Sequence, residues 1–237
     1  MAERYQRNYS TVRPTAADID QGLRAYMLKV YNIMGLGLTI TGLVAWFTAQ
    51  SPALLNAIYG TPLMWVVMLA PLGFVIFLSA RINKMSASAA QTTFWIYSAV
   101  MGLSLSFIFL AYTGTSVARV FFITAAAFGS LSLYGYTTRK SLTGWGSFLF
   151  MGLIGIIIAS VVNIFFASPA LSFAISIIGV LVFAGLTAYD TQAIKQMYYA
   201  GDGHEVGTKK AVMGALRLYL DFINLFLMLL RLLGNRS

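Results

Sequence analysis

Two aspartates that lie in or beside long apolar stretches are the residues of this sequence best suited to do chemistry. Of the seven acidic residues in the chain, only Asp190 and Asp221 have such surroundings. Two buried carboxylates that lie close together cannot both ionise cheaply, so such a pair titrates as a unit. A pair of this kind can bind a hard cation through its oxygens, change state with pH, or perform acid–base chemistry on water.

The helical register predicts that the two aspartates lie at similar depth. The segment that carries Asp190 reads as helical until Gly201 and Gly203 break it, which places Asp190 roughly 15 Å before that end. The next segment is predicted to begin near Thr208, a fair N-cap residue, which places Asp221 roughly 20 Å from that start. Two antiparallel helices joined by a short loop would therefore bring the two carboxyl groups together.

The last apolar segment, residues 211–233, carries polar side chains along one face. In a helix, the spacing of Arg217, Asp221, Asn224 and Arg231 puts them on a single stripe. A charged group at the centre of a bilayer costs about 2.5–3.5 kcal/mol even on lenient insertion scales. The stripe is therefore expected to face other helices, water or a partner charge, with Arg217 and Asn224 as the shell that supports Asp221.

Two arginines are candidate partners for the aspartates. In a purely structural interpretation, Asp221 pairs with Arg217 four residues earlier and Asp190 pairs with Arg81. Arg81 ends the second apolar segment, on the same side of the membrane as Asp190. In a functional interpretation, Arg81 is a latch that bridges Asp190, closes a path, and lets go when the carboxylate is protonated. The sequence leaves both interpretations open.

The composition is that of a polytopic membrane protein with an all-α fold. Hydrophobic residues make up 59% of the 237 residues and charged residues 10%, whereas soluble domains are about 25% charged. A spanning helix needs about 20 largely apolar residues; six segments meet this requirement, and residues 211–233 are a seventh candidate that is weakened by its charges. The six segments are about 29–49, 62–81, 93–113, 116–136, 145–166 and 170–190.

The chain is expected to divide into a cytoplasmic tail, residues 1–28, and a transmembrane bundle domain, residues 29–237. The tail is polar and is expected to hold only a short amphipathic approach helix. Twelve of the sixteen Lys and Arg residues fall on the same side as the N-terminus when the segments cross in turn, so that side is predicted to be cytoplasmic. Whether residues 211–233 cross fully or are re-entrant, which sets the side of Arg231 and Arg236, stays open.

Several classes of site and partner are disfavoured. The sequence has no cysteine and a single histidine, His204, which rules out disulfides and thiolate metal sites and argues against histidine-based zinc or haem sites. The net charge of +9 is attributed to residues that flank the spans, not to nucleic-acid binding. No cofactor is expected beyond calcium as a bound or permeant ion, and the expected partner throughout is the lipid bilayer.

Several motifs resemble the Bax inhibitor-1 family, also called the transmembrane Bax inhibitor motif family. The most specific is the Asp-Phe-Ile-Asn-Leu-Phe run from Asp221 to Phe226. The likeness begins at about Ala25, covers nearly all of the chain beyond it, and is strongest to the bacterial branch. The other matching stretches are Tyr189-Asp190-Thr191-Gln192, Leu218-Tyr219-Leu220, Leu229-Leu230-Arg231, Leu133-Tyr134-Gly135-Tyr136-Thr137-Thr138, Gly144-Trp145-Gly146-Ser147-Phe148-Leu149 and Asn163-Ile164-Phe165.

The resemblance implies a seven-helix bundle of the bacterial inner membrane in which the last helix is central. It also implies a non-enzymatic calcium leak, gated by pH through Asp190 and Asp221, with Arg81 at the position of a latch on the first aspartate. Both aspartates are then candidate calcium ligands. One departure is that Ser141, where many relatives carry an acidic residue, follows the basic pair Arg139-Lys140. A role for a carboxylate in that loop is therefore in doubt.

Two other functions compete with the leak. Tyr189-Asp190 is similar to the Tyr-Asp of intramembrane aspartyl proteases, but Pro169-Ala170-Leu171 precedes both aspartates instead of following the second. The order of motifs therefore argues against a protease. The alternative that the resemblance allows is a non-enzymatic regulator of membrane protein quality control or of cell-death and stress signalling. Such a regulator would act through a protein partner, for example a membrane protease.

Overall fold

The computed structural model describes the backbone of residues 16–236 and the side chains of residues 19–236, and its regular elements there are all helices. Seven helical segments of this part of the chain are long and apolar enough to cross a membrane, which confirms the predicted all-α, seven-helix architecture. The elements are α1 (Ala16–Ala49), α2 (Pro52–Tyr59), α3 (Leu63–Arg81), the 3-10 turn η1 (Ile82–Lys84), α4 (Ala87–Leu105), α5 (Ile108–Ala111), α6 (Gly114–Thr137), α7 (Thr143–Phe166), α8 (Pro169–Met197) and α9 (His204–Leu233).

The first helix begins earlier than predicted. Residues 1–15 of the predicted tail lie outside the described part, but α1 runs from Ala16 straight through the predicted boundary at residue 28. Tyr26 and Met27 are buried in the core of the bundle, because this end of α1 packs against other helices rather than only approaching the membrane. Burial of apolar side chains by neighbouring helices is what extends a helix beyond the apolar run that the sequence displays.

The last helix also begins earlier than predicted, at His204 instead of near Thr208. Gly203 occupies the N-cap position without a side-chain hydrogen bond. Thr208 is buried one turn inside α9, where its hydroxyl donates to the carbonyl of His204 and accepts from the ammonium of Lys29 on α1. A threonine that bonds back to the preceding turn can sit inside a helix, so its capping tendency was misleading here.

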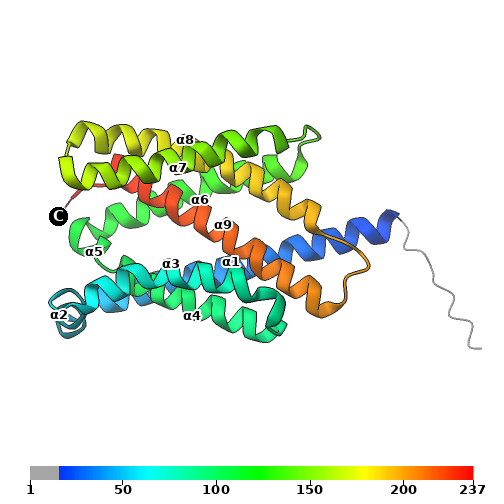
Figure 1. The fold of residues 1–237 in the computed structure, drawn as a ribbon, viewed down its shortest axis with the longest axis horizontal. Coiled ribbons are helices and arrows are strands. Elements are labelled where there is room, and N and C mark those ends of the chain that lie inside the picture. The colour runs from blue at the N-terminus through cyan, green and yellow to red at the C-terminus, as the bar shows by residue number, and fades with distance from the viewer. Residues whose placement is uncertain (1–15, 237) are drawn as a thin grey trace, which may run out of the picture.

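α9 is the central helix of the bundle. In Figure 1 it runs diagonally between one group formed by α1, α3 and α4 and another formed by α6, α7 and α8. It packs against α1, α4, α6 and α8. Of its most apolar 18-residue stretch, 67% is buried inside the protein, against 11% for α7 at the periphery. Of the polar stripe of the last segment, Asp221 is buried inside the protein and Asn224 is half-buried, whereas Arg217 and Arg231 are exposed.

α9 is continuous from one end of the bundle to the other. Its thirty residues correspond to about 45 Å, more than the roughly 30 Å of a hydrocarbon core. Figure 1 shows its C-terminal end beside α5, opposite to the end where α1 begins. Backbone pairing of Tyr112 with Arg236 fixes that placement. The full crossing thus holds and the re-entrant alternative does not, so Arg231 and Arg236 lie at the end opposite to the start of α1.

A close helix contact sets the position of α8 against α6. Gly135 of α6 is buried against the backbone of α8, and a Cβ atom added there would lie 2.2 Å from the carbonyl oxygen of Ala188. Only glycine permits this approach, which is the use that membrane helices make of small residues. Because Ala188 is two residues before Asp190, the contact also positions the first aspartate.

We predict that Gly135→Ala destabilises the bundle by about 1–3 kcal/mol, because the added methyl group would push α6 away from α8. Thermal unfolding of the detergent-solubilised protein, followed by tryptophan fluorescence, measures this. Gly129→Ala is the matched control on the same helix, since no heavy atom lies within 4 Å of a Cβ at that position. Equal stability of the two variants would contradict the close contact.

Candidate functional site

Asp221 and Asp190 face each other from the two antiparallel helices α9 and α8. Asp221 is 4% exposed, and its Oδ2 atom accepts no hydrogen bond from any described residue. Asp190 is half-buried on α8. Their side chains lie close enough for the charge of one to affect the other, so the pair takes up protons as a unit. The structure thus brings together the two carboxylates that the helical register had placed at similar depth.

Arg217 lies beside both carboxylates, but its ion pair is with Asp190. The Nη1 atom of Arg217 is 3.9 Å from Oδ1 of Asp190, with no comparably close pair to Asp221 among the described residues. This differs from the structural interpretation that paired Arg217 with Asp221. Side chains on a helix lean toward its N-terminus, which carries the guanidinium of Arg217 away from Asp221 one turn later and toward the neighbouring helix.

Arg81 does not reach Asp190 in this structure. It ends α3, is exposed, and forms no ion pair with a carboxylate in the described part of the chain. In Figure 1, α3 and α8 lie on opposite sides of α9. The predicted pair of Arg81 and Asp190 is therefore absent from this conformation, and Arg217 occupies the place beside Asp190.

Asn224 bonds to its own helix. Its Nδ2 atom donates to the carbonyl oxygen of Leu220 over 2.8 Å, and Asn224 makes no other hydrogen bond to the described residues. Of the two residues that were expected to support Asp221, Arg217 thus contributes through Asp190, whereas Asn224 bonds to the backbone of α9 about two turns before Arg231 ends its polar stripe.

Two sets of hydroxyl groups, which sequence reasoning missed, tie the site helices to their neighbours. Ser132 of α6 bonds to Thr191 of α8 over 2.9 Å and to Tyr31 of α1 over 2.6 Å. Tyr219 of α9 bonds to Thr41 of α1 over 2.6 Å. Thr191 follows Asp190 directly and Tyr219 precedes Asp221 by two residues. Thr191 and Tyr219 lie in the family motifs quoted above, which was a signal available in the sequence. Their hydrogen-bond partners could not be inferred, because the partners depend on how the helices are rotated.

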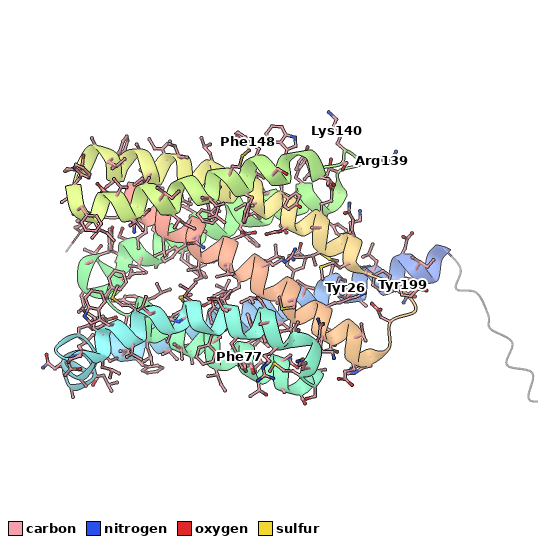
Figure 2. All side chains as sticks on the ribbon, in the orientation of Figure 1. Tyr26, Phe77, Arg139, Lys140, Phe148 and Tyr199 are labelled. Atoms are coloured by element: carbon pink, nitrogen blue, oxygen red, sulfur yellow. The ribbon has the colours of Figure 1, made fainter. Side chains whose placement is uncertain are left out.

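At the end of the bundle where α8 connects to α9, lysine side chains donate hydrogen bonds to backbone carbonyl groups. Lys195 donates to the carbonyl of Tyr136 and lies over its ring, and Lys210 donates to the carbonyl of Met197 and pairs with Asp202. Figure 2 shows Tyr26 and Tyr199 at this end, beside the α8–α9 loop. The hydroxyl of Tyr26 is buried, has no hydrogen bond to the described residues, and lies near both Arg217 and Asp202.

The described residues of the site do not form a complete cage for a metal ion. Among the described residues, no group of three or more His, Cys, Asp or Glu side chains comes together. Calcium takes six to eight oxygen ligands, so Asp190 and Asp221 would supply at most part of the shell, with water and hydroxyl or carbonyl oxygens for the rest.

Comparison with known proteins finds relatives along almost the entire chain. Residues 23–237 match the family model described as inhibitor of apoptosis-promoting Bax1. The inner membrane protein YbhL of Escherichia coli K12 is 48% identical over 237 residues, which cover 99% of each protein. An uncharacterized protein of Rickettsia prowazekii is 52% identical over 92% of each chain. A Streptococcus pyogenes membrane protein is 37% identical over 92% of this chain and 96% of its own.

We predict that Arg217 and Asp190 are energetically coupled by about 0.5–1 kcal/mol, as expected for a partly exposed ion pair. A double-mutant cycle with Arg217→Gln and Asp190→Asn, read out by chemical unfolding in detergent, measures the coupling. A cycle with Arg81→Gln in place of Arg217→Gln is the control and should give no coupling. Coupling of Asp190 to Arg81 and not to Arg217 would show that the pairing described here is wrong.

Proposed function

The chain belongs to the Bax inhibitor-1 family of integral membrane proteins, and we propose that it is a calcium leak pathway that pH controls through Asp190 and Asp221. One observation carries the proposal. Two carboxylates from different helices meet inside the bundle, and a single arginine pairs with one of them. Ionisable groups inside a membrane are costly, so their presence favours a role in ion or proton movement.

The proposed closed state is held by the ion pair between Arg217 and Asp190. In that state the guanidinium of Arg217 is paired with the carboxylate of Asp190, which a cation would need as a ligand. When pH falls and the pair takes up a proton, Asp190 loses its charge and no longer holds Arg217. Arg217 is 47% exposed, so part of its side chain is free of contacts that would hold it in place. The other charged or titratable groups near it, Asp202 and Tyr26, lie toward the α8–α9 loop, where the guanidinium would go.

Release of Arg217 would open the path for a cation between α8 and α9. Calcium and protons then compete for the same two carboxylates, so flux is expected to rise as pH falls and to decline again once both carboxylates are protonated. Arg81 keeps its proposed role as a latch only in a further conformation in which α3 approaches α8. In this proposal the protein is not an enzyme and needs no cofactor.

We place the protein in a bacterial inner membrane with its N-terminus in the cytoplasm. The support is the name of its Escherichia coli relative, an inner membrane protein, together with the Lys and Arg residues that gather at the end where α1 begins. With α9 crossing fully, Arg231 and Arg236 then lie on the extracytoplasmic side.

We predict that purified protein in liposomes lets calcium through faster by about tenfold as the pH is lowered from the range where the pair is ionised to the range where it has taken up one proton, which corresponds to about 1.4 kcal/mol in the balance of closed and open states. An entrapped calcium-sensitive dye measures the flux. In the double variant Asp190→Asn, Asp221→Asn, we expect the pH dependence to disappear because neither side chain can bind or release a proton.

The charge-matched control is the double variant Asp20→Asn, Glu205→Gln, which removes two exposed carboxylates outside the pair and should keep the response to pH. Equal flux in the native protein and in the variant without the aspartate pair would remove the pair from the mechanism. Absence of flux from folded native protein at every pH would overturn the leak itself and favour a regulator that acts through a protein partner.

A further inference from the structure

A cationic cavity lies at the C-terminal end of α9, at the opposite end of the bundle from the start of α1. Its volume is about 500 Å³. Arg231 from the last turn of α9 and Arg236 from the segment after it both line the cavity. The rest of the wall comes from the α5–α6 connection and from the turn between α7 and α8, namely Tyr112, Asn163, Ala167, Pro169, Ser172, Phe173 and Ser176.

The segment that carries Arg236 is held in place by backbone contacts. The N–H of Thr113 donates to the carbonyl of Asn235 over 3.1 Å, and the N–H of Asn235 donates to the hydroxyl of Ser116 over 2.9 Å. Arg236 itself pairs with Tyr112 as an antiparallel bridge. These contacts hold the segment of Arg236 beside the last turn of α9, which carries Arg231. Both arginines therefore line the same cavity.

The two arginines have no counter-ion among the described residues. The described ion pairs use Lys209, Lys210 and Arg217, and no acidic side chain lines the cavity. Two positive charges that line one cavity repel each other, and an anion between them removes that cost. Guanidinium groups bind carboxylate and phosphate in a two-pronged geometry, so the pair is suited to an oxyanion.

The neutral polar groups of the cavity have hydrogen-bond donors to spare. Asn163 donates to the hydroxyl of Ser172 over 2.7 Å and accepts from the N–H of Ser168 over 3.0 Å. The hydroxyl of Ser172 therefore keeps its own proton for another acceptor, and the hydroxyl of Tyr112 has no hydrogen bond to the described residues. An anion with several acceptor oxygens, such as phosphate, can use all of these donors.

One wall of the cavity is apolar and continues into an exposed apolar surface. Phe173 lines the cavity and is exposed, and Phe165 and Phe166 in the adjoining turn of α7 are 82% and 75% exposed. A free anion would gain nothing from these side chains, whereas the acyl chains of a lipid would pack on them. We propose that this cavity binds the phosphate group of a phospholipid, with the acyl chains along α8. The proposal is independent of the calcium leak.

Binding of short-chain lipids to the delipidated protein in detergent tests the proposal. We expect dioctanoyl phosphatidylglycerol to bind at least tenfold more weakly to the double variant Arg231→Gln, Arg236→Gln than to the native protein, as measured by thermophoresis. Dioctanoylglycerol, which lacks the phosphate, should bind weakly to both proteins. Inorganic phosphate, added alone, reports whether the site also accepts phosphate without a lipid.

The control variant is Arg139→Gln, Lys140→Gln, which removes the same charge at the other end of the bundle, as Figure 2 shows. It should bind phosphatidylglycerol within about twofold of the native protein. Variants are compared only after their unfolding temperatures match that of the native protein. Ser172→Ala, which removes one hydroxyl donor and leaves both charges, should weaken binding by about tenfold or less.

Three results would overturn the proposal. They are equal phosphatidylglycerol binding with and without the two arginines, dioctanoylglycerol binding as tight as that of the phospholipid, and an equal loss in the control variant. Inorganic phosphate could also bind as tightly as the phospholipid and depend equally on the two arginines. The cavity would then be a phosphate-binding site whose ligand is free phosphate. Tighter binding of the phospholipid supports the lipid as the source.

Discussion

The cost of placing charge in hydrocarbon is the constraint on which the rest of this structure depends. A spanning helix with Arg217 and Asp221 near its middle cannot lie at the edge of the bundle, because lipid would face at least one of them. The structure meets the constraint by surrounding α9 with α1, α4, α6 and α8, so that the carboxylate of Asp221 is buried in protein. The peripheral helix α7, which carries no charge, exposes most of its apolar surface.

The same constraint explains how the site is assembled. A short loop joins α8 to the central helix α9, so the two helices lie antiparallel beside each other. Asp190 of α8 then lies against Asp221 of α9. Neither carboxylate can be left fully charged in such surroundings without a partner, and Arg217 supplies a partner to Asp190 only. Protonation of the pair and its ion pair with Arg217 are therefore coupled. Glycine contacts such as Gly135 against Ala188 and the hydroxyl bonds of Ser132 and Tyr219 keep the helices close enough for the coupling to persist.

Much of the fold could be predicted because the rules of the bilayer are strict. Twenty apolar residues in a row imply a span, and a polar stripe on an apolar helix implies that the stripe faces away from lipid, whereas the central place of α9 was implied by the family resemblance. The helical rise alone placed Asp190 and Asp221 at one depth. None of these inferences required knowledge of how the helices are rotated about their axes.

What could not be predicted depends on that rotation or on packing outside the bilayer. The partner of Arg217 changes from Asp221 to Asp190 because its side chain leans toward the N-terminus of α9 and meets the neighbouring helix. The start of α1 at Ala16 and of α9 at His204 follows from contacts with other helices, which no capping residue announces. The absence of an ion pair between Arg81 and Asp190 reflects where α3 lies, and the sequence carries no direct record of that placement.

The central claim is that the charge state of Asp190 and Asp221 sets the relative position of α8 and α9. Because the chain has no cysteine, spin labels at Gln196→Cys and Val206→Cys report on that position without further substitution. Pulsed electron spin resonance in lipid discs then compares distances along a pH titration that takes the pair from its ionised to its protonated state. We expect the distance distribution to shift with pH when both aspartates are present and to stay fixed when both are asparagine. No shift in the protein with the native pair, or the same shift without the pair, would contradict the account.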